Sequence, residues 1–205
     1  MKRIVMTILI AVCTLSTAMA QAKVVEDPQT DATYRIPLQK GAVVMTERVS
    51  PLVCGLATQF NLVDFCAWKF TTNQPSEVYA SRKGVVVEAT DNSVLILHED
   101  GLYSEYMGLG NVKVAQGESV KAGARLGAAK ARHADIEGEG KWSVVMMVYH
   151  VRSNPEYGQV ALNGAYKHLR QYINPIFTTR GKCKTHLIEG NAYTVRTRTW
   201  CWPWE

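Results

Sequence analysis

The stretch that decides the fold is "SEVYASRKGVVVEATDNSVLILHEDGLYSEYMGL", Ser76 to Leu109. It holds four runs rich in β-branched and aromatic residues, and the dipeptides Asp91-Asn92 and Asp100-Gly101 between them are hairpin turn signals. Short strands at such close spacing indicate an antiparallel, mainly β core. The predicted strands are Val78–Ala80, Gly84–Ala89, Ser93–His98 and Leu102–Met107.

The segments around this stretch extend the β pattern. In "VKVAQGESVKAGARLGAA", Gly117 and Gly123 are available for tight turns at positive φ. The apolar run Trp142–Val151 predicts a long strand that is buried on both faces. Ala42–Met45 is a further candidate strand, and Thr71–Ser76 has the composition of a loop.

The C-terminal part predicts one helix and a tail. In "YGQVALNGAYKHLRQYINP" the apolar residues recur at helical spacing until Pro175, so we expect a helix there. The tail has two alternating runs around Glu189-Gly190-Asn191, which predict a hairpin closed by a disulfide between Cys183 and Cys201.

The N-terminus has the features of a secretory signal at residues 1–20. Lys2 and Arg3 precede a short apolar run, and Ala18-Met19-Ala20 is a small-residue cleavage site. A lipoprotein signal ending at Cys13 is the alternative. Residues 21–205 contain no apolar run of the ~20 residues that a membrane span needs. We therefore expect a secreted protein of the bacterial periplasm.

The charge and the cysteines of residues 21–205 fit this expectation. The segment carries 21 basic and 18 acidic residues, scattered along the chain, which gives no grounds for nucleic-acid binding but suits an anionic polymer such as cell-wall material. Its four cysteines are Cys54, Cys66, Cys183 and Cys201. Proximity favours the pairs Cys54–Cys66 and Cys183–Cys201, because short loops close at lower entropic cost. A zinc site of four cysteines is the alternative, although no CxxC pair is present.

Four blocks of sequence resemble the LytM-like domain of the M23 family of peptidoglycan endopeptidases. They lie in order between about Asp64 and Pro175 and read "PSEVYASRKGVVVEA", "NSVLILHEDGLYSEYMGL", "VKVAQGESVKAGARLG" and "YINPI". The resemblance implies an antiparallel β-sandwich built on a duplicated hybrid motif. It divides the mature chain into an extended lead-in at 21–53, an M23-like domain at 54–177 and a C-terminal hairpin extension at 178–205.

Active members of that family bind zinc through the histidine and aspartate of an HxGxD motif and the second histidine of an HxH strand. The first HxH histidine and the histidine of a YxHL motif assist the attacking water. Carried over to this chain, Asp64 matches the aspartate, Phe60 stands at the HxGxD histidine, and Gly108 follows Tyr106 at the YxHL histidine. His150 matches the second HxH position only if Val148 takes the first.

The resemblance therefore implies a degenerate member without catalysis and without a cofactor. Phe60, Val148 and the neighbouring methionines would fill the former cleft with apolar groups, which exclude a hydrated cation. Degenerate members of the family activate cell-wall hydrolases or act as scaffolds. The expected partner is peptidoglycan or an envelope protein such as a cell-wall hydrolase.

Two other functions stay open at this point. One is an active zinc endopeptidase with the unorthodox ligands Asp64 and His150, and with His133 as a candidate third ligand. The other is a lipoyl- or biotinyl-like hybrid barrel, whose sequences share the rhythm of "GESVKAGARLG" but carry a modifiable lysine that is missing here.

The remaining histidines and tryptophans have simpler interpretations beside the functional ones. His98 is expected in an exposed turn, and His168 and His186 on the surface. His133, Asp135 and Glu137 form either a solvated loop or a small acidic site for a metal or peptide. Trp200, Trp202 and Trp204 share one face of a strand, either as a packed lid over the core or as an exposed row for sugar rings or a partner.

Overall fold

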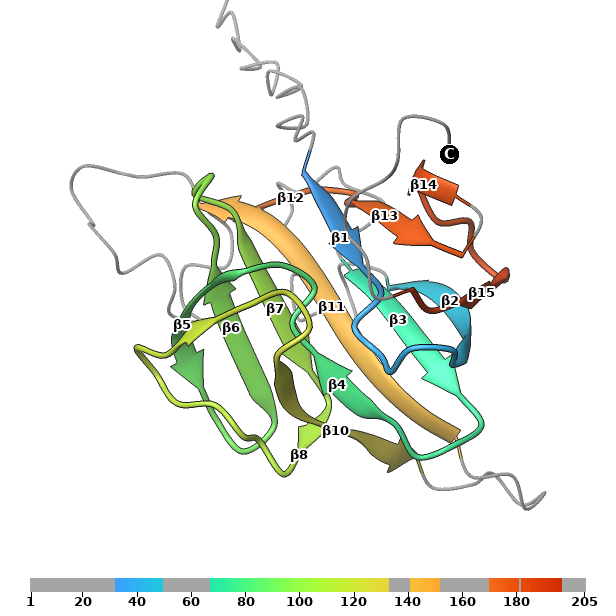
Figure 1. Cartoon of the computed structure of the whole chain (residues 1–205), viewed down its shortest axis with the longest axis horizontal. Helices are drawn as coiled ribbons and strands as arrows, with labels where there is room; N and C mark the ends of the chain where they lie inside the picture. The colour runs from blue at the N-terminus through green and yellow to red at the C-terminus, as the bar shows by residue number, and fades with distance from the viewer. Residues whose placement is uncertain (1–31, 50–66, 133–140, 152–169, 181, 197–205) are drawn as a thin grey trace, which may run out of the picture.

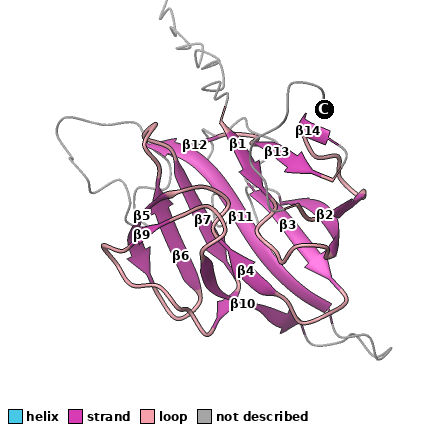
Figure 2. Ribbon diagram, in the orientation of Figure 1, coloured by secondary structure: helices cyan, strands magenta, loops and turns pink. Residues whose placement is uncertain are grey.

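The computed structural model describes residues 32–49, 67–132, 141–151, 170–180 and 182–196. In these ranges the chain forms strands and loops only, as Figure 2 shows. The mainly β, antiparallel fold expected from the sequence is confirmed. Among the residues described there is accordingly no helix of the length and apolarity that a membrane crossing requires.

The larger sheet has 12 strands and is antiparallel throughout. Its main path runs β15 (Ala192–Thr194), β2 (Val43–Val49), β3 (Ala67–Thr72), β11 (Lys141–Val151), β7 (Tyr103–Met107), β6 (Ser93–Leu97), β5 (Gly84–Ala89) and β9 (Ser119–Val120). Off this path lie β4 (Glu77–Tyr79), β8 (Leu109–Gly110), β10 (Arg125–Arg132) and β12 (Arg170–Tyr172).

A second, three-stranded sheet has the order β1 (Thr33–Arg35), β13 (Ile176–Thr179), β14 (Lys182–Thr185). Here β1 and β13 are parallel, whereas β13 and β14 are antiparallel. Figure 1 shows this small sheet beside β2 and β3, on the far side of the molecule from β5 and β6.

Strand β11 runs through the middle of the molecule between β3 and β7 (Figure 1). Since side chains alternate between the two faces of a strand, its residues fall into two sets. Val144, Met146 and Val148 pack into the main core, whereas Met147 and Tyr149 belong to a smaller second cluster on the other face. The long strand predicted from Trp142–Val151, buried on both faces, is confirmed.

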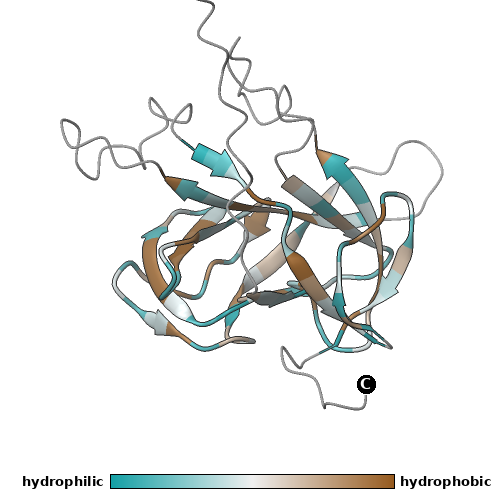
Figure 3. Ribbon diagram, turned by 90° about the horizontal axis from the view of Figure 1, so that it is seen from above, coloured by the Kyte–Doolittle hydropathy of each residue, from teal (hydrophilic) through white to brown (hydrophobic). Residues whose placement is uncertain are grey.

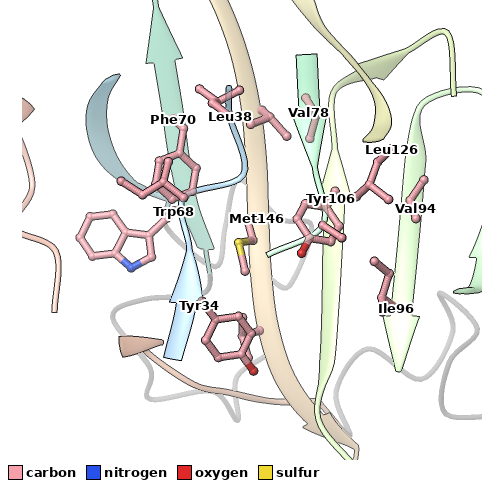
Figure 4. Close-up of a cluster of buried hydrophobic side chains, with 14 of the residues drawn as sticks. Tyr34, Leu38, Trp68, Phe70, Val78, Val94, Ile96, Tyr106, Leu126 and Met146 are labelled. Carbon is pink, nitrogen blue, oxygen red and sulfur yellow. The ribbon is translucent and has the colours of Figure 1, made fainter. Parts of the chain in front are cut away.

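The main core joins the two sheets. Tyr34 of β1 and Phe177 of β13 pack with Trp68, Phe70, Tyr106 and Met146 of the larger sheet, as the close-up in Figure 4 shows for all but Phe177. Hydropathy follows this arrangement, because hydrophobic stretches lie on the strands and hydrophilic stretches follow the outer loops (Figure 3). The small sheet is thus part of the same hydrophobic core as the large one.

The turns around the deciding stretch are also confirmed. Gly101 has a φ of 78° and donates its N–H to the His98 carbonyl at 3.0 Å, which closes the β6–β7 hairpin. Gly117 and Gly123 have φ values of 87° and 86°. Such left-handed conformations favour glycine because it has no Cβ.

Two elements of the C-terminal part differ from the expectation. The final residues of the predicted helix, Arg170–Tyr172, form strand β12 and pair with Tyr149–Val151, while the rest of that segment lies outside the described residues. The two tail runs do form strands, but they do not pair with each other. Strand β14 pairs with β13 and β15 pairs with β2, because both sheet edges offer free backbone groups close by.

Thr71 and Thr72 were expected in a loop and instead complete strand β3, both largely buried between β2 and β11. β-branched residues favour a paired strand, and this preference explains why the two threonines belong to β3 although polar loop residues follow them.

Candidate functional site

The candidate site was expected around five residues, and the structure describes three of them. Tyr106 and Gly108 lie at the end of β7, and His150 lies near the end of β11. Phe60 and Asp64 lie outside the described residues.

Gly108 lies against the first half of β11. It follows Met107, which faces Val145 across the β7–β11 ladder, and a Cβ at Gly108 would come within 3.4 Å of the Ser143 carbonyl oxygen. Its φ of 81° is one that few residues other than glycine adopt, so a side chain there would also strain the backbone. A glycine therefore suits this position structurally, where the family carries a histidine.

His150 does not adjoin this point. It faces Gln171 of β12, five residues beyond Val145 along β11, which is about 17 Å at the rise of a β-strand. His150 therefore lies well away from position 108 along the strand. Val148, the other half of the expected HxH pair, is buried in the main core opposite Ser104.

The β11 residues nearest to Gly108 in the ladder are Val144, which is buried in the main core, and Val145, which faces Met107, the residue before Gly108. Across the other edge of β11, Ser143 faces Thr71 and Val145 faces Lys69 of β3. Directly opposed residues of neighbouring strands point to the same face, so Met107, Val145 and Lys69 form one row across β7, β11 and β3. We call these three residues the cross-strand row.

The cross-strand row is apolar and carries a cation. The Lys69 ammonium bonds to Glu47 Oε2 of β2 at 2.5 Å, and the lysine side chain is only 12% exposed. Met107 and Val145 are partly buried and pack against the second cluster. Beyond the row, Met45 and Val43 of β2 are exposed.

Comparison with known proteins relates the central part of the chain to one family. The model of peptidase family M23 matches residues 66–155. The chain contains an M23-like domain. No curated protein sequence matches the chain.

Several solved structures resemble the M23-like domain in fold. Pseudoalterin, described as a novel M23 metalloprotease from the deep sea, has 12% identity and a TM-score of 0.45, with 82% of this chain and 98% of that chain covered. A complex of SpoIIIAH and SpoIIQ has 21% identity and a TM-score of 0.41, covering 57% and 91%. A zinc-containing peptidase from Vibrio cholerae has 21% identity and a TM-score of 0.39, covering 57% and 36%.

The residues at the cross-strand row do not fit the zinc that active M23 members hold. Zinc takes nitrogen, sulfur or carboxylate ligands, whereas this row offers a thioether, a valine and an ammonium. The lysine charge repels a divalent cation at close range. Within the described ranges, no three His, Cys, Asp or Glu side chains gather in a way that would hold a metal ion.

The expectation of an exposed His98 is wrong, because its side chain is 3% exposed and fully hydrogen-bonded. Nδ1 lies 2.8 Å from the Lys83 carbonyl oxygen and so carries the proton, while Nε2 accepts from the Ser104 hydroxyl at 2.9 Å. Tyr106 continues this network: its hydroxyl lies 3.2 Å from Ser104 Oγ and accepts the Ser81 N–H at 2.8 Å.

Burial is the largest influence on the pKa values of His98 and Tyr106 in this network. It lowers the pKa of His98 from 6.5 to about 4, and it raises the pKa of Tyr106 against the opposing effect of the hydrogen bonds with Ser104 and Ser81. Both groups are therefore neutral near pH 7. A neutral, inward-facing network of this kind positions strands β6 and β7 and offers no group to a substrate.

A second polar cluster lies on the other face of β7 and β11. Glu105 accepts from Arg170 at 2.7 Å and from the Tyr149 hydroxyl at 3.0 Å, and the Arg170 guanidinium lies 4.4 Å from the centre of the Tyr149 ring. Burial raises the pKa of Tyr149, and the Glu105 carboxylate adds to that rise. The cluster fixes β12 onto β11.

The remaining predicted residues are placed as follows. His186 is exposed, as expected. Cys183 takes part in a disulfide bond, but its expected partner Cys201 lies outside the described residues, so that pairing stays a prediction. The same holds for a set of residues that sequence reasoning named and the structure does not describe: Cys54, Cys66, His133, Asp135, Glu137, His168, Trp200, Trp202 and Trp204.

Sequence reasoning did not single out the cross-strand row, because the register that brings Lys69, Val145 and Met107 together is not visible in the sequence. The HxH motif was expected at Val148 and His150 because His150 is the only histidine in the apolar run Trp142–Val151.

Proposed function

We propose that this chain is a secreted, catalytically inactive M23-like module that binds in the cell envelope. Its targets in this proposal are peptidoglycan or an envelope protein such as a cell-wall hydrolase, in the bacterial periplasm. The observation that carries the proposal is that Gly108 offers no side chain at the YxHL position, while Val148, expected at the HxH strand, is buried in the main core.

The exposed face of β2 has features that suit binding. Met45 and Val43 of β2 are 45% and 59% exposed and continue the face of the cross-strand row toward the sheet edge. Exposed apolar side chains that adjoin each other on one sheet face are typical of interaction surfaces. Loss of catalytic groups therefore does not require loss of this surface.

The first experiment tests inactivity. The oxidised chain 21–205 is titrated with zinc by calorimetry, with Asp64→Ala and His150→Ala beside it, and is incubated with cross-linked peptidoglycan. We expect no site-specific zinc binding and no hydrolysis. Micromolar or tighter binding that either substitution abolishes, together with loss of cross-links, would instead establish the alternative of an active endopeptidase with unorthodox ligands.

The second experiment tests the exposed face of β2 as a binding surface. Purified peptidoglycan, and separately an envelope extract, are used to capture the wild-type chain, Met45→Glu and the matched control Val85→Glu, whose valine is 41% exposed on β5. We expect Met45→Glu to weaken capture and Val85→Glu to leave it unchanged. Equal capture of all three proteins would show that the exposed face of β2 is not the binding surface.

A further inference from the structure

The net positive charge of residues 21–205 lies in the C-terminal extension, residues 178–205. Residues 21–177 hold sixteen basic and sixteen acidic residues, whereas residues 178–205 hold five basic and two acidic ones. The whole positive excess of the mature chain therefore lies in the last 28 residues. An excess placed at one end of a molecule gives that end a positive field.

The structure presents three of these cations together. Lys182 and Lys184 are exposed on β14, where they alternate with the partly buried Cys183 and Thr185 and so share one face, about 7 Å apart. Arg180 is exposed in the turn between β13 and β14. We call Arg180, Lys182 and Lys184 the basic edge.

The basic edge is open to a partner. Strand β14 is the outer strand of the three-stranded sheet, and Figure 1 shows it at the margin of the molecule. The ion pairs between described residues involve none of the three cations. Glu189, the one acid of the extension that the structure describes, is turned toward β2, where its carboxylate accepts the Arg48 N–H at 3.3 Å.

An apolar side chain accompanies these charges. Ile188 is 60% exposed, the most exposed large hydrophobic residue among those described, and it follows β14 by three residues. A soluble polyanion would use only the cations. The headgroup layer of a bilayer accommodates cations and an exposed aliphatic side chain at once, because its phosphates border the acyl region.

We propose that the basic edge binds the surface of a bilayer that contains anionic phospholipids. Lys182 and Lys184 contact lipid phosphates from one face of β14, Arg180 adds a bidentate donor, and Ile188 enters the headgroup boundary. The binding is electrostatic in origin and weakens as salt rises. It tethers the M23-like domain to a membrane, while the face of β2, β3 and β11 that carries Met45 and the cross-strand row remains available.

The test uses the oxidised chain 21–205 and two sets of vesicles, phosphatidylglycerol mixed with phosphatidylcholine and phosphatidylcholine alone. Sedimentation measures the bound fraction for the wild type and for the variant Arg180→Gln/Lys182→Gln/Lys184→Gln. The control is Lys113→Gln/Lys121→Gln/Lys130→Gln, which removes three exposed lysines elsewhere and leaves the same net charge. Circular dichroism checks the fold of each protein, and the double variant Lys182→Gln/Lys184→Gln replaces the triple one if that fails to fold.

We expect the wild type to bind only the anionic vesicles. Each basic residue near such a surface contributes about fivefold to the affinity, so the basic-edge variant should bind roughly a hundredfold more weakly and the control should stay close to wild type. An equal loss in both variants would show that only net charge matters and would overturn the proposal. Absence of vesicle binding, with capture by purified peptidoglycan that needs the basic edge, would assign the edge to a cell-wall polymer instead.

Discussion

Burial of His98 makes the stability of this protein depend on pH. Its folded pKa of about 4 lies below the unfolded value of 6.5, so between these values the unfolded chain binds more protons than the folded one. The stability that His98 contributes is complete above pH 6.5 and is lost as the pH falls toward 4. The loss at pH 5 amounts to about 2 kcal/mol.

Urea unfolding at pH 7.5 and pH 5 measures this loss. In His98→Gln, the amide can bond to the Lys83 carbonyl or to Ser104, and it has no proton to gain. We expect this variant to be less stable than wild type at pH 7.5 but to lose about 2 kcal/mol less between the two pH values. The same pH dependence in both proteins would show that other groups cause it.

Gly84 is required by close packing at the start of β5. A Cβ there would lie 2.3 Å from the Leu97 carbonyl oxygen and 2.6 Å from an Ile96 methyl carbon, whereas a Cβ at Gly110 would meet only the Lys130 side chain, at 3.6 Å. Backbone cannot move away cheaply, so Gly84→Ala should lower the free energy of unfolding by about 3 kcal/mol or more. Gly110→Ala should change it by less than about 1 kcal/mol. Thermal unfolding followed by circular dichroism separates the two, and similar values for both would contradict the packing argument.

At the scale of strands, the Glu105–Arg170 pair adds a buried side-chain contact to the backbone ladder between β12 and β11. The Arg170 side chain is 4% exposed and the Glu105 side chain 16%, so removal of one partner leaves a buried charge. Glu105→Ala should cost about 3–5 kcal/mol. Glu99→Ala, which breaks the exposed pair with Lys83, should cost at most about 1 kcal/mol. Denaturant unfolding gives both values, and a small cost for Glu105→Ala would mean that the ladder and the aromatic contacts hold β12 without the ion pair.

The register of the cross-strand row can be tested by introducing metal ligands at Lys69, Val145 and the neighbouring Ser143. The variant Lys69→Asp/Ser143→His/Val145→His places two imidazoles and a carboxylate on one face of β11 and β3. Three such ligands with an open fourth position suit zinc, so we expect calorimetric binding at micromolar affinity or tighter. Lys69→Asp alone should bind none, since a single carboxylate does not hold the ion. Failure of the triple variant to bind, with its fold intact, would contradict the register that brings these three positions together.

At the scale of the whole molecule, the shared core predicts one cooperative unfolding transition. Phe177 of the small sheet is fully buried, 5.8 Å from Phe70 and 6.4 Å from Tyr34 between ring centres. Phe177→Ala should destabilise the protein by about 3–5 kcal/mol and shift far-UV circular dichroism and tryptophan fluorescence together. Two separate transitions would mean that the small sheet folds as its own unit.

The sequence predicted those parts of this fold that depend on local chemistry. Turn residues such as Gly101 and Gly117, and the run of β-favouring residues at Ser93–Leu97, act within a few residues, so they could be read correctly. Strand partners could not be predicted, because β15 pairs with β2, more than a hundred residues earlier in the chain, while β14 pairs with its neighbour β13 and not with β15. The prediction that His98 is exposed was wrong for a related reason. The Lys83 carbonyl that bonds to its ring lies just before β5, 15 residues earlier in the chain, so the residues next to His98 do not indicate that it is buried.

For the candidate site, the resemblance gave the motif types and placed Tyr106 and Gly108 next to an apolar strand. The choice of Val148 and His150 on that strand followed residue identity and stays a prediction, because the long uniform run of β11 offers no internal mark from which register could be counted.

Strand β11 also keeps two kinds of position apart within one segment. Ser143 and Val145 lie on one face of the strand, while Val144, Met146 and Val148, which pack into the main core, lie on the other. Substitutions in the first set leave the second set untouched, so this face of the sheet can change one residue at a time while the main core stays intact. The alternation of a single β-strand thereby separates the evolution of a surface from the evolution of stability.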